Sequence, residues 1–332
     1  SEHRLPCLHV VTRNGFNSVR QVTSLEWLRE LYVDNMRICE LFNPDDIQHV
    51  VLPPRLVTLE LKYLGFRILP PLPDATLKRL VWHEDGPSDL FRRTGPLPSS
   101  LVHLECNLYS QFELPDLPPF LEHLDLYSSR LPTRDLPALS PTLKHLSVDF
   151  CNLTRLPDNL PLQLAHLSCS SNALTVLPAL PKTLEYIDCG FNRLTAPLPD
   201  LPDTLRFLNC DDNNLTALPA LPAGLIFLHC IDNQLRSLPP LPVALQILAC
   251  SSNYRLATLP APLPPTMKCL RSSDTNLLRL PALPRTLEFL ECTGQQNGME
   301  ELPALHDTAL ITLACQDNGL RTLPSLPETL QR

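Results

Sequence analysis

Leucines recur along almost the whole chain at a nearly constant spacing. The clearest copies, residues 177–195, 198–216 and 218–236, read LPALPKTLEYIDCGFNRLT, LPDLPDTLRFLNCDDNNLT and LPALPAGLIFLHCIDNQLR. In each copy, apolar and polar residues alternate after the first strand leucine, which is typical of a half-buried strand. Self-similarity at a fixed, short period predicts a solenoid in which every unit contributes one short strand.

We number each unit from its first strand leucine, which is position 0. Positions 0, +3 and +5 are predicted to face a continuous core, and positions +1, +2 and +4 to face outward, because strand side chains alternate. The asparagine at +8 is expected to turn the chain and bond the neighbouring backbone. The LPxLP segment is expected to return in extended polyproline geometry. Fourteen units begin at Leu28, Leu56, Leu77, Leu101, Leu121, Leu143, Leu164, Leu184, Leu205, Leu225, Leu245, Met267, Leu287 and Leu310.

The spacing predicts an α/β-type repeat solenoid of the leucine-rich repeat class, with about 14 repeats. We expect a parallel β-sheet on the concave face and an extended, polyproline-like convex side. Residues 1–27 are interpreted as an N-terminal cap segment, 28–100 as irregular repeats, and 101–332 as regular repeats with a period of about 20–24. Because Leu330 stands where a further unit would begin, we expect the chain to be truncated at its C-terminus.

Composition narrows the class of partner. The chain has 37 prolines but only 9 glycines, which favours an ordered proline-bearing fold over disorder. Its net charge of −8 disfavours nucleic acid and anionic membranes, both of which reward a basic face. No apolar run approaches the length of a membrane span, which is roughly 20 residues. No phosphate-binding loop or metal-binding motif occurs, so we expect no cofactor and no metal.

Most cysteines are expected to pack in the core as small apolar residues. We interpret them as a ladder of reduced thiols, which favours a cytoplasmic location. Three of them also match a Cys-x-Asp nucleophile motif, but burial would make them inert. Cys269 and Cys7 are better candidates for reactive thiols, and we expect no catalytic residue. The ladder at +5 consists of Cys106, Cys169, Cys189, Cys210, Cys230, Cys250, Cys292 and Cys315.

Position +2 carries the candidate partner-binding residues. These are four histidines, then an aromatic and aliphatic stripe. Neighbouring strands lie about 4.8 Å apart, so the rings should touch. Two interpretations stay open: the stripe stabilises the sheet by stacking, or it contacts a protein partner. The candidates, with charged neighbours, are His103, His123, His145, His166, Tyr186, Phe207, Phe227, Ile247, Phe289, Glu105, Asp125, Asp188, His229, Arg271 and Glu291.

The four histidines allow two sharper hypotheses. Neighbouring imidazoles with Glu105 or Asp125 could bind zinc, although strands in register hold side chains parallel rather than converging. Alternatively, the histidines could protonate below about pH 6 and change the affinity for a partner. An ordinary solvated repeat surface is the third interpretation.

The LPxLPxxL linker with its short and nearly constant period resembles the leucine-rich repeats of bacterial type III secretion effectors, the YopM and IpaH/SspH families. The resemblance is good over residues 69–332 and poor over 28–68. It implies a secreted effector that binds a protein on its concave face in the host cytoplasm or nucleus, as the substrate-recognition part of an effector or ubiquitin ligase. Residues 1–27 are short for the helical hairpin cap of those families, and their ligase domain is not present.

Two alternatives and one further hypothesis remain from the residues. The chain could be a eukaryotic or viral intracellular adaptor or scaffold, or a surface adhesion protein with oxidised cysteines. Homo-oligomers could form through the open ends of the solenoid.

Overall fold

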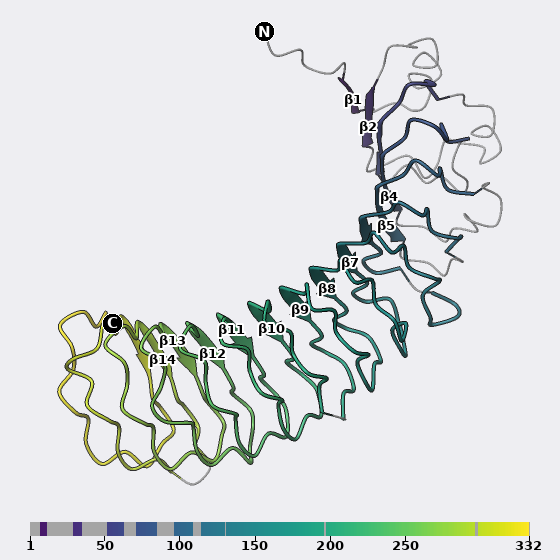
Figure 1. The fold of residues 1–332 in the computed structure, drawn as a ribbon. Helices are drawn as coiled ribbons and strands as arrows, with labels where there is room; N and C mark the ends of the chain where they lie inside the picture. Colours follow the sequence, from purple (N-terminus) through teal and green to yellow (C-terminus); the bar gives the residue numbers. More distant parts are fainter. Residues whose placement is uncertain are drawn as a thin grey trace. The chain divides into compact units, whose positions relative to one another are not determined.

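The chain folds into short parallel strands that follow one another in sequence order (Figure 1). The computed structural model describes residues 7–11, 29–34, 52–62, 71–84, 96–108, 114–129, 131–195, 197–295 and 298–331. The strands in these residues are β1 (Cys7–Val11), β2 (Glu30–Asp34), β3 (Thr58–Lys62), β4 (Arg79–Glu84), β5 (His103–Leu108), β6 (His123–Asp125), β7 (His145–Ser147), β8 (His166–Ser168), β9 (Tyr186–Asp188), β10 (Phe207–Asn209), β11 (Phe227–His229), β12 (Ile247–Ala249), β13 (Cys269–Arg271), β14 (Phe289–Glu291) and β15 (Thr312–Ala314).

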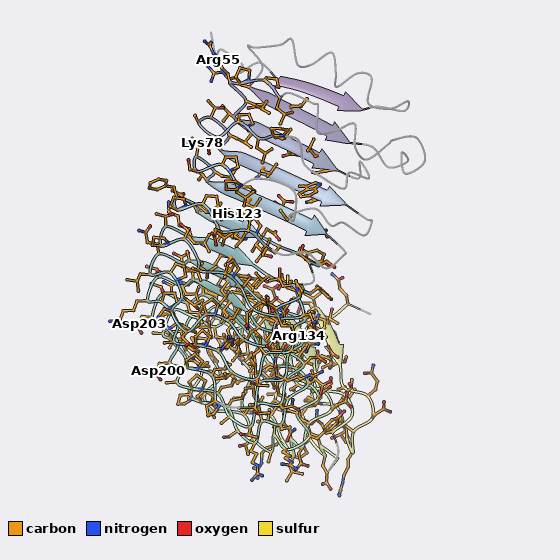
Figure 2. The ribbon with its side chains drawn as sticks, turned by 90° about the vertical axis from the view of Figure 1, so that its right-hand side faces the viewer. Arg55, Lys78, His123, Arg134, Asp200 and Asp203 are labelled. Carbon is orange, nitrogen blue, oxygen red and sulfur yellow. The ribbon has the colours of Figure 1, made fainter. Side chains whose placement is uncertain are left out.

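The chain divides into two compact units, Ser1–His166 and Leu167–Arg332. In the first unit each strand from β1 to β7 pairs in parallel with the next, and in the second unit the same holds from β9 to β15. Figure 2 shows the parallel strands of the first unit from the side, with Lys78 and His123 labelled near strand starts. The structure therefore confirms the predicted leucine-rich repeat solenoid with a parallel sheet.

Register places the same repeat position side by side on neighbouring strands. Phe207 pairs with Tyr186 on one side and with Phe227 on the other. The return segments between strands contain no helix among the described residues and are extended apart from tight turns, as proline at fixed places favours. Residues 7–11, which the sequence assigned to a cap segment, form β1 and pair with β2.

Alternate strand positions build the core as predicted. Leu184, Ile187 and Cys189 occupy positions 0, +3 and +5 of one unit, and all three are fully buried. Leu194, at +10 of the same unit, is 1% exposed and adds a second apolar layer. Burying one such side chain stabilises a fold by about 1.5–3 kcal/mol. The described units from Leu56 to Leu287 repeat this burial at positions 0, +3 and +5, whereas Leu313 and Cys315 of the last unit are only half-buried. The core therefore continues from coil to coil within each compact unit up to that last coil.

The asparagines at +8 hold the turn that follows each strand. Asn213 donates through Nδ2 to the carbonyl oxygens of Cys189, Cys210 and Asp211, and its Oδ1 accepts from the backbone N–H of Leu194. Two of these contacts reach the preceding coil. The expected bonding of neighbouring backbone by asparagine is thus confirmed. The asparagine side chain thus provides partners for four backbone groups, two in its own turn and two in the preceding coil.

The residue at +7, directly before position +8, adopts a left-handed backbone conformation in unit after unit. Side chains other than glycine rarely adopt it, and it is most costly for bulky residues. Serine, aspartate and glycine occupy most of these positions, but two carry phenylalanine. The residues at +7 with a backbone φ between 50° and 64° are Ser128, Phe150, Ser171, Phe191, Asp212, Asp232, Ser252, Asp274, Gly294 and Asp317.

Candidate functional site

Four histidines form a continuous stack on the outward side of the strands in the first unit. His103, His123, His145 and His166 occupy position +2, and their ring centroids follow one another at 4.0 Å with interplanar angles of 6–20°. All four side chains are half-buried because each ring covers the face of the next. The parallel register places identical side chains directly beside one another, as the sequence pattern predicts.

The stack favours neutral imidazoles. Burial, reinforced by the neighbouring histidines, lowers the pKa of His123 to about 3. The same two causes lower the pKa of His166 to about 4, and burial lowers the pKa of His145. For His123 and His166 the expected protonation below about pH 6 is therefore wrong, because their pKa values lie at about 3 and about 4.

The zinc hypothesis finds no set of ligands in the described part of the chain. The rings of the stack lie parallel, so their nitrogen atoms do not converge on one point. No group of three histidine, cysteine, aspartate or glutamate side chains among the described residues could hold a metal ion.

Glu105, beside the first histidine of the stack, is surrounded by bases. Its Oε1 lies 2.9 Å from Nε2 of His83, its Oε2 lies 3.7 Å from Nε2 of His103, and Arg79 approaches Oε2 at 3.5 Å. Arg79 also contacts the ring nitrogen of His103. Hydrogen bonds from His103 and His83 hold the pKa of Glu105 well below its usual range. Glu105 is thus an ionised side chain that already has positive and polar partners.

An aromatic stripe continues position +2 in the second unit. The rings of Tyr186 and Phe207 stack with centroids 4.4 Å apart and an interplanar angle of 7°. Phe227 follows at 6.0 Å with a tilted ring, and Ile247 pairs with it on β12. All four side chains are half-buried. The stripe is therefore continuous as predicted, but its members cover part of one another and present one edge outward.

Charged side chains flank the stripe. Asp188 accepts hydrogen bonds from the backbone N–H of Gly190 and from Nδ2 of Asn209. Asp211 accepts a bond from the N–H of Ile231, and burial raises the pKa of its carboxyl to about 6. His229 lies 3.8 Å from Asp211 and has its pKa lowered by burial. This edge of the stripe therefore combines apolar rings with carboxylates.

The last predicted site residues form a smaller group on β13 and β14. The guanidinium carbon of Arg271 lies 5.1 Å from the ring centroid of Phe289, a cation–π contact. Its Nε lies 3.7 Å from Glu291. Arg271 is exposed, whereas the other fourteen predicted site residues are half-buried. The structure therefore places the predicted residues in two rows at +2 with their charged neighbours at +4.

Solved structures of YopM resemble the chain over most of its length. YopM from Yersinia enterocolitica is 32% identical, covers 93% of this chain and 73% of its own, and has a TM-score of 0.61. YopM from Yersinia pestis, described as a leucine-rich effector protein, is 30% identical, covers 82% of this chain and 86% of its own, and has a TM-score of 0.57. The chain belongs to the family of bacterial effector-type leucine-rich repeat proteins.

The other comparisons found no relative of this effector-type protein. No protein-family model matches the chain, and no curated protein does. Among the described residues, no helix has the length and apolar character needed to cross a membrane.

The thiols of this effector-type protein are largely buried. Cys210 and Cys230, both in Cys-x-Asp sequences, are fully buried, and burial raises their pKa well above the ordinary value. Cys315 is only half-buried, yet burial still raises its pKa. Cys269, expected to be a better candidate for a reactive thiol than the core cysteines, is half-buried, and burial raises its pKa as well. The side chain of Cys7 lies outside the described residues.

Three exposed aromatic residues that lie just beyond strand ends, at +6 or +7, were missed by the sequence analysis. Tyr127, Phe150 and Phe191 are 43%, 49% and 56% exposed, more than any ring of the stripe. They occupy +6 or +7, where the strand has already ended. The available signal was the departure from the repeat: phenylalanine stands at +7 where most units have serine or aspartate.

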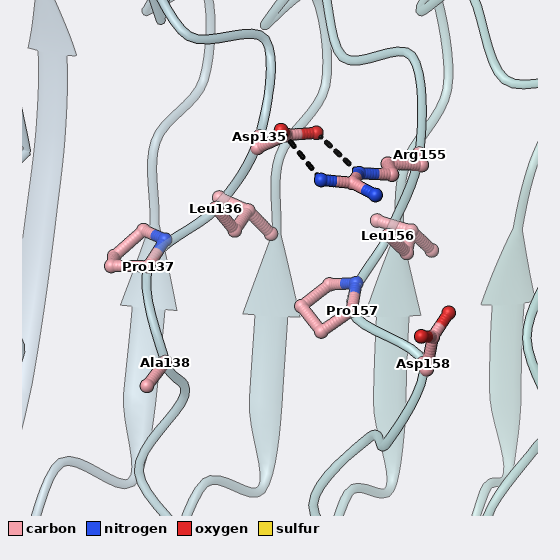
Figure 3. Close-up of a pocket in the computed structure, with 8 residues that line it drawn as sticks. All are labelled: Asp135, Leu136, Pro137, Ala138, Arg155, Leu156, Pro157 and Asp158. Carbon is pink, nitrogen blue, oxygen red and sulfur yellow. Dashed lines mark hydrogen bonds and ion pairs between the residues drawn. The ribbon is translucent and has the colours of Figure 1, made fainter.

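The return side of the first unit also contains a cleft (Figure 3). It has a volume of about 240 Å³ and lies between two successive return segments, 135–138 and 155–158. At one end Arg155 donates two hydrogen bonds to the carboxylate of Asp135, at 2.9 and 3.0 Å. The charges of Arg155 and Asp135 satisfy each other, so this end of the cleft offers no unpaired charge to a ligand. We therefore place the candidate site on the sheet.

Proposed function

We propose that the chain is a protein-interaction module of a bacterial effector and binds a protein partner on the outward face of its sheet. The observation that carries this proposal is the continuous stripe Tyr186–Phe207–Phe227–Ile247. Flat apolar side chains in a row offer a large contact area, and aromatic residues dominate the centres of protein interfaces. Membership of the effector family supports an interaction role.

The charge of this face supports a basic partner surface. The chain carries a net charge of −8, and Asp188 and Asp211 lie beside the stripe. Complementary charge increases the rate of association and orients the partner, while the apolar stripe provides contact area. Nucleic acid and anionic membranes do not fit an acidic surface of this kind.

We further propose that the protein acts inside a host cell, in the cytoplasm or nucleus. The similar YopM of Yersinia pestis is described as an effector protein. The ten cysteines whose side chains are described form no disulfide, which suits a reducing compartment. A role as the recognition part of a ubiquitin ligase stays a prediction, tested by asking whether a captured partner becomes ubiquitylated.

The test is affinity capture from a eukaryotic cell lysate with matched variants. The first variant carries Tyr186→His, Phe207→His and Phe227→His. Histidine already stacks at this position in the first unit, so these changes keep flat rings while removing apolar character. The control variant carries Val243→Ser, on a return segment where the side chain is 70% exposed. Circular dichroism and urea unfolding establish that both variants fold.

We expect the wild-type chain and the Val243→Ser control to retain the same partner, and the histidine variant to lose it. Retention of that partner by a folded histidine variant would show that the stripe only stabilises the sheet. A second variant, Ile247→Lys, extends the test to a position that carries no ring and takes no part in the stacking. It should also release the partner.

A further inference from the structure

A second aromatic surface lies in the first unit, just beyond the ends of two strands. Tyr127 follows β6 and Phe150 follows β7. Their ring centroids are 5.5 Å apart, and the rings meet edge to face at 63°. Both side chains are nearly half exposed, at 43% and 49%. Unlike the stripe, this pair therefore presents much of its ring surface to solvent.

The backbone holds Phe150 in an unfavourable conformation. Its φ is 58°, which bulky side chains rarely adopt, whereas the same position holds Ser128 and Ser171 in the neighbouring units. Backbone hydrogen bonds from Ser128 to Asp149 and from Leu126 to Ser147 fasten this edge. A phenylalanine that costs free energy and gains little burial indicates a role outside the fold, since strain of this kind gathers at functional sites.

Two carboxylates accompany the pair. Asp125 accepts a hydrogen bond from the backbone N–H of Tyr127 at 3.0 Å, which ties it to the base of that ring. Asp149 precedes Phe150 directly and lies 3.5 Å from the hydroxyl of Ser147. Burial raises the pKa of Asp125, so a positive charge nearby would stabilise its ionised form. Burial lowers the pKa of the adjacent His145, which disfavours a positive charge on that ring.

We propose that Tyr127 and Phe150, together with Asp125 and Asp149, hold an arginine side chain of the partner protein. A guanidinium stacks on aromatic faces and pairs with carboxylates, and this edge offers both within neighbouring coils. The inference deepens the proposed function, on which it rests, by naming the chemistry recognised in the first unit. The residues at this edge lie outside the +2 rows.

The experiment uses the purified full chain and two synthetic peptides. One fluorescein-labelled peptide contains three Arg-Gly-Ser repeats. The other replaces each arginine with citrulline, which keeps the shape but removes the charge. The main variant combines Tyr127→Ser and Phe150→Ser, placing serine where other units carry it. Neither substitution changes the net charge, so non-specific attraction of the peptide stays the same.

Two further variants make the comparison sharp. Phe120→Ser is the matched control. Phe120 is 64% exposed and lies in the turn before β6, whereas Tyr127 and Phe150 follow the last residues of their strands. Asp125→Asn keeps both rings and can still accept the bond from Tyr127. Fluorescence anisotropy gives the dissociation constants, and urea unfolding gives the stability of each variant.

We expect the wild-type chain to prefer the arginine peptide by about tenfold, the size of one desolvated cation–π and charge contact. The double serine variant should lose this preference while unfolding at the same or a higher urea concentration. Phe120→Ser should keep it, and Asp125→Asn should reduce it. Equal binding of both peptides by the wild type, or an unchanged preference in the folded double variant, would overturn the proposal.

Failure of this inference and failure of the proposed function are distinguishable. The peptide experiment involves neither a lysate nor the stripe in the second unit. If the wild-type chain prefers the arginine peptide but the stripe variants still capture the partner, only the proposed role of the stripe is contradicted. If the stripe variants lose the partner but the wild-type chain shows no preference for the arginine peptide, only the arginine site is contradicted.

Discussion

Each buried asparagine at +8 forms hydrogen bonds with four backbone groups through a single side chain. Asn213 is 8% exposed and makes three donor contacts and one acceptor contact. Removing it leaves the buried N–H of Leu194 without its acceptor. The three carbonyl oxygens each keep another donor, from Asn192, Asn233 or the backbone of Phe191. A buried N–H that loses its partner costs about 1–3 kcal/mol. Single residues of this kind therefore hold neighbouring coils together.

The first prediction compares two adjacent asparagines. Asn213→Ala should lower the free energy of unfolding by about 1–3 kcal/mol, because it leaves the buried N–H of Leu194 without an acceptor. Asn214→Ala changes the exposed side chain at +9 and should stay within about 0.5 kcal/mol of wild type. Urea unfolding followed by circular dichroism measures both. Equal effects of the two substitutions would contradict the role given to position +8.

For single residues, the sequence pattern predicts which side chains are buried in the core. It does not predict their backbone conformation or their partial exposure. The alternation of apolar positions predicts that Leu184 and Cys189 face the core, because strand geometry alone decides it. The left-handed conformation at Phe191 accompanies a hydrogen bond from its N–H to the carbonyl oxygen of Asp211 in the next coil, which exists only after stacking. The half-burial of Tyr186 likewise comes from the ring of Phe207 on the next strand.

Strands in register create properties that no single strand has. In β5–β8, four imidazoles share one row, and each removes water from the next. The charged form of a ring within the row is disfavoured by burial and by its neighbours. His123 and His166 therefore present uncharged aromatic surfaces at neutral pH, and protonating them in acid opposes the stacking.

The second prediction concerns stability in acid. The pKa of His123 is about 3 and that of His166 about 4 in the folded chain, against about 6.5 in an unfolded one. Between these values the unfolded chain binds more protons, so the free energy of unfolding falls as pH decreases below about 6.5. The lowered pKa of Glu105 adds a loss in the same direction at still lower pH.

The measurement is urea unfolding at pH 7.5, 5.5 and 4.5 for wild type and His123→Phe. Phenylalanine keeps a flat ring in the row and removes one titrating group, so the variant should lose less stability on acidification. The raised pKa of Asp211 acts in the opposite direction in wild type and variant alike, and the comparison cancels it. An identical pH dependence in both proteins would contradict the lowered pKa of His123.

Each compact unit is built from coils that contact mainly their neighbours. A solenoid of this kind has a stability close to the sum of its repeats and of the interfaces between them. Tyr186, Phe207 and Phe227 pair in register on neighbouring strands. Each repeat therefore places its side chains on the same face as the repeat before it. The length of the period therefore matters more than the identity of any one coil.

The third prediction tests this modularity by deletion. Removing residues 205–224, one full period, should bring the strand at Leu225 beside the strand at Leu184 in the same register. We expect a folded chain of somewhat lower stability. Removing residues 205–214 shifts strand residues against return residues and should abolish cooperative unfolding of the second unit. Circular dichroism and urea unfolding would contradict the account if both deletions behaved alike.

The most direct test of the central claim, that the outward face of the sheet binds the partner, is site-specific photo-cross-linking in eukaryotic cytosol. One chain carries benzoylphenylalanine in place of Phe227 on that face, and another carries it in place of Val243 on the return side. We predict a cross-linked partner from position 227 and none from position 243. Cross-linking of a partner only from position 243 would contradict the account and place the interaction on the return side.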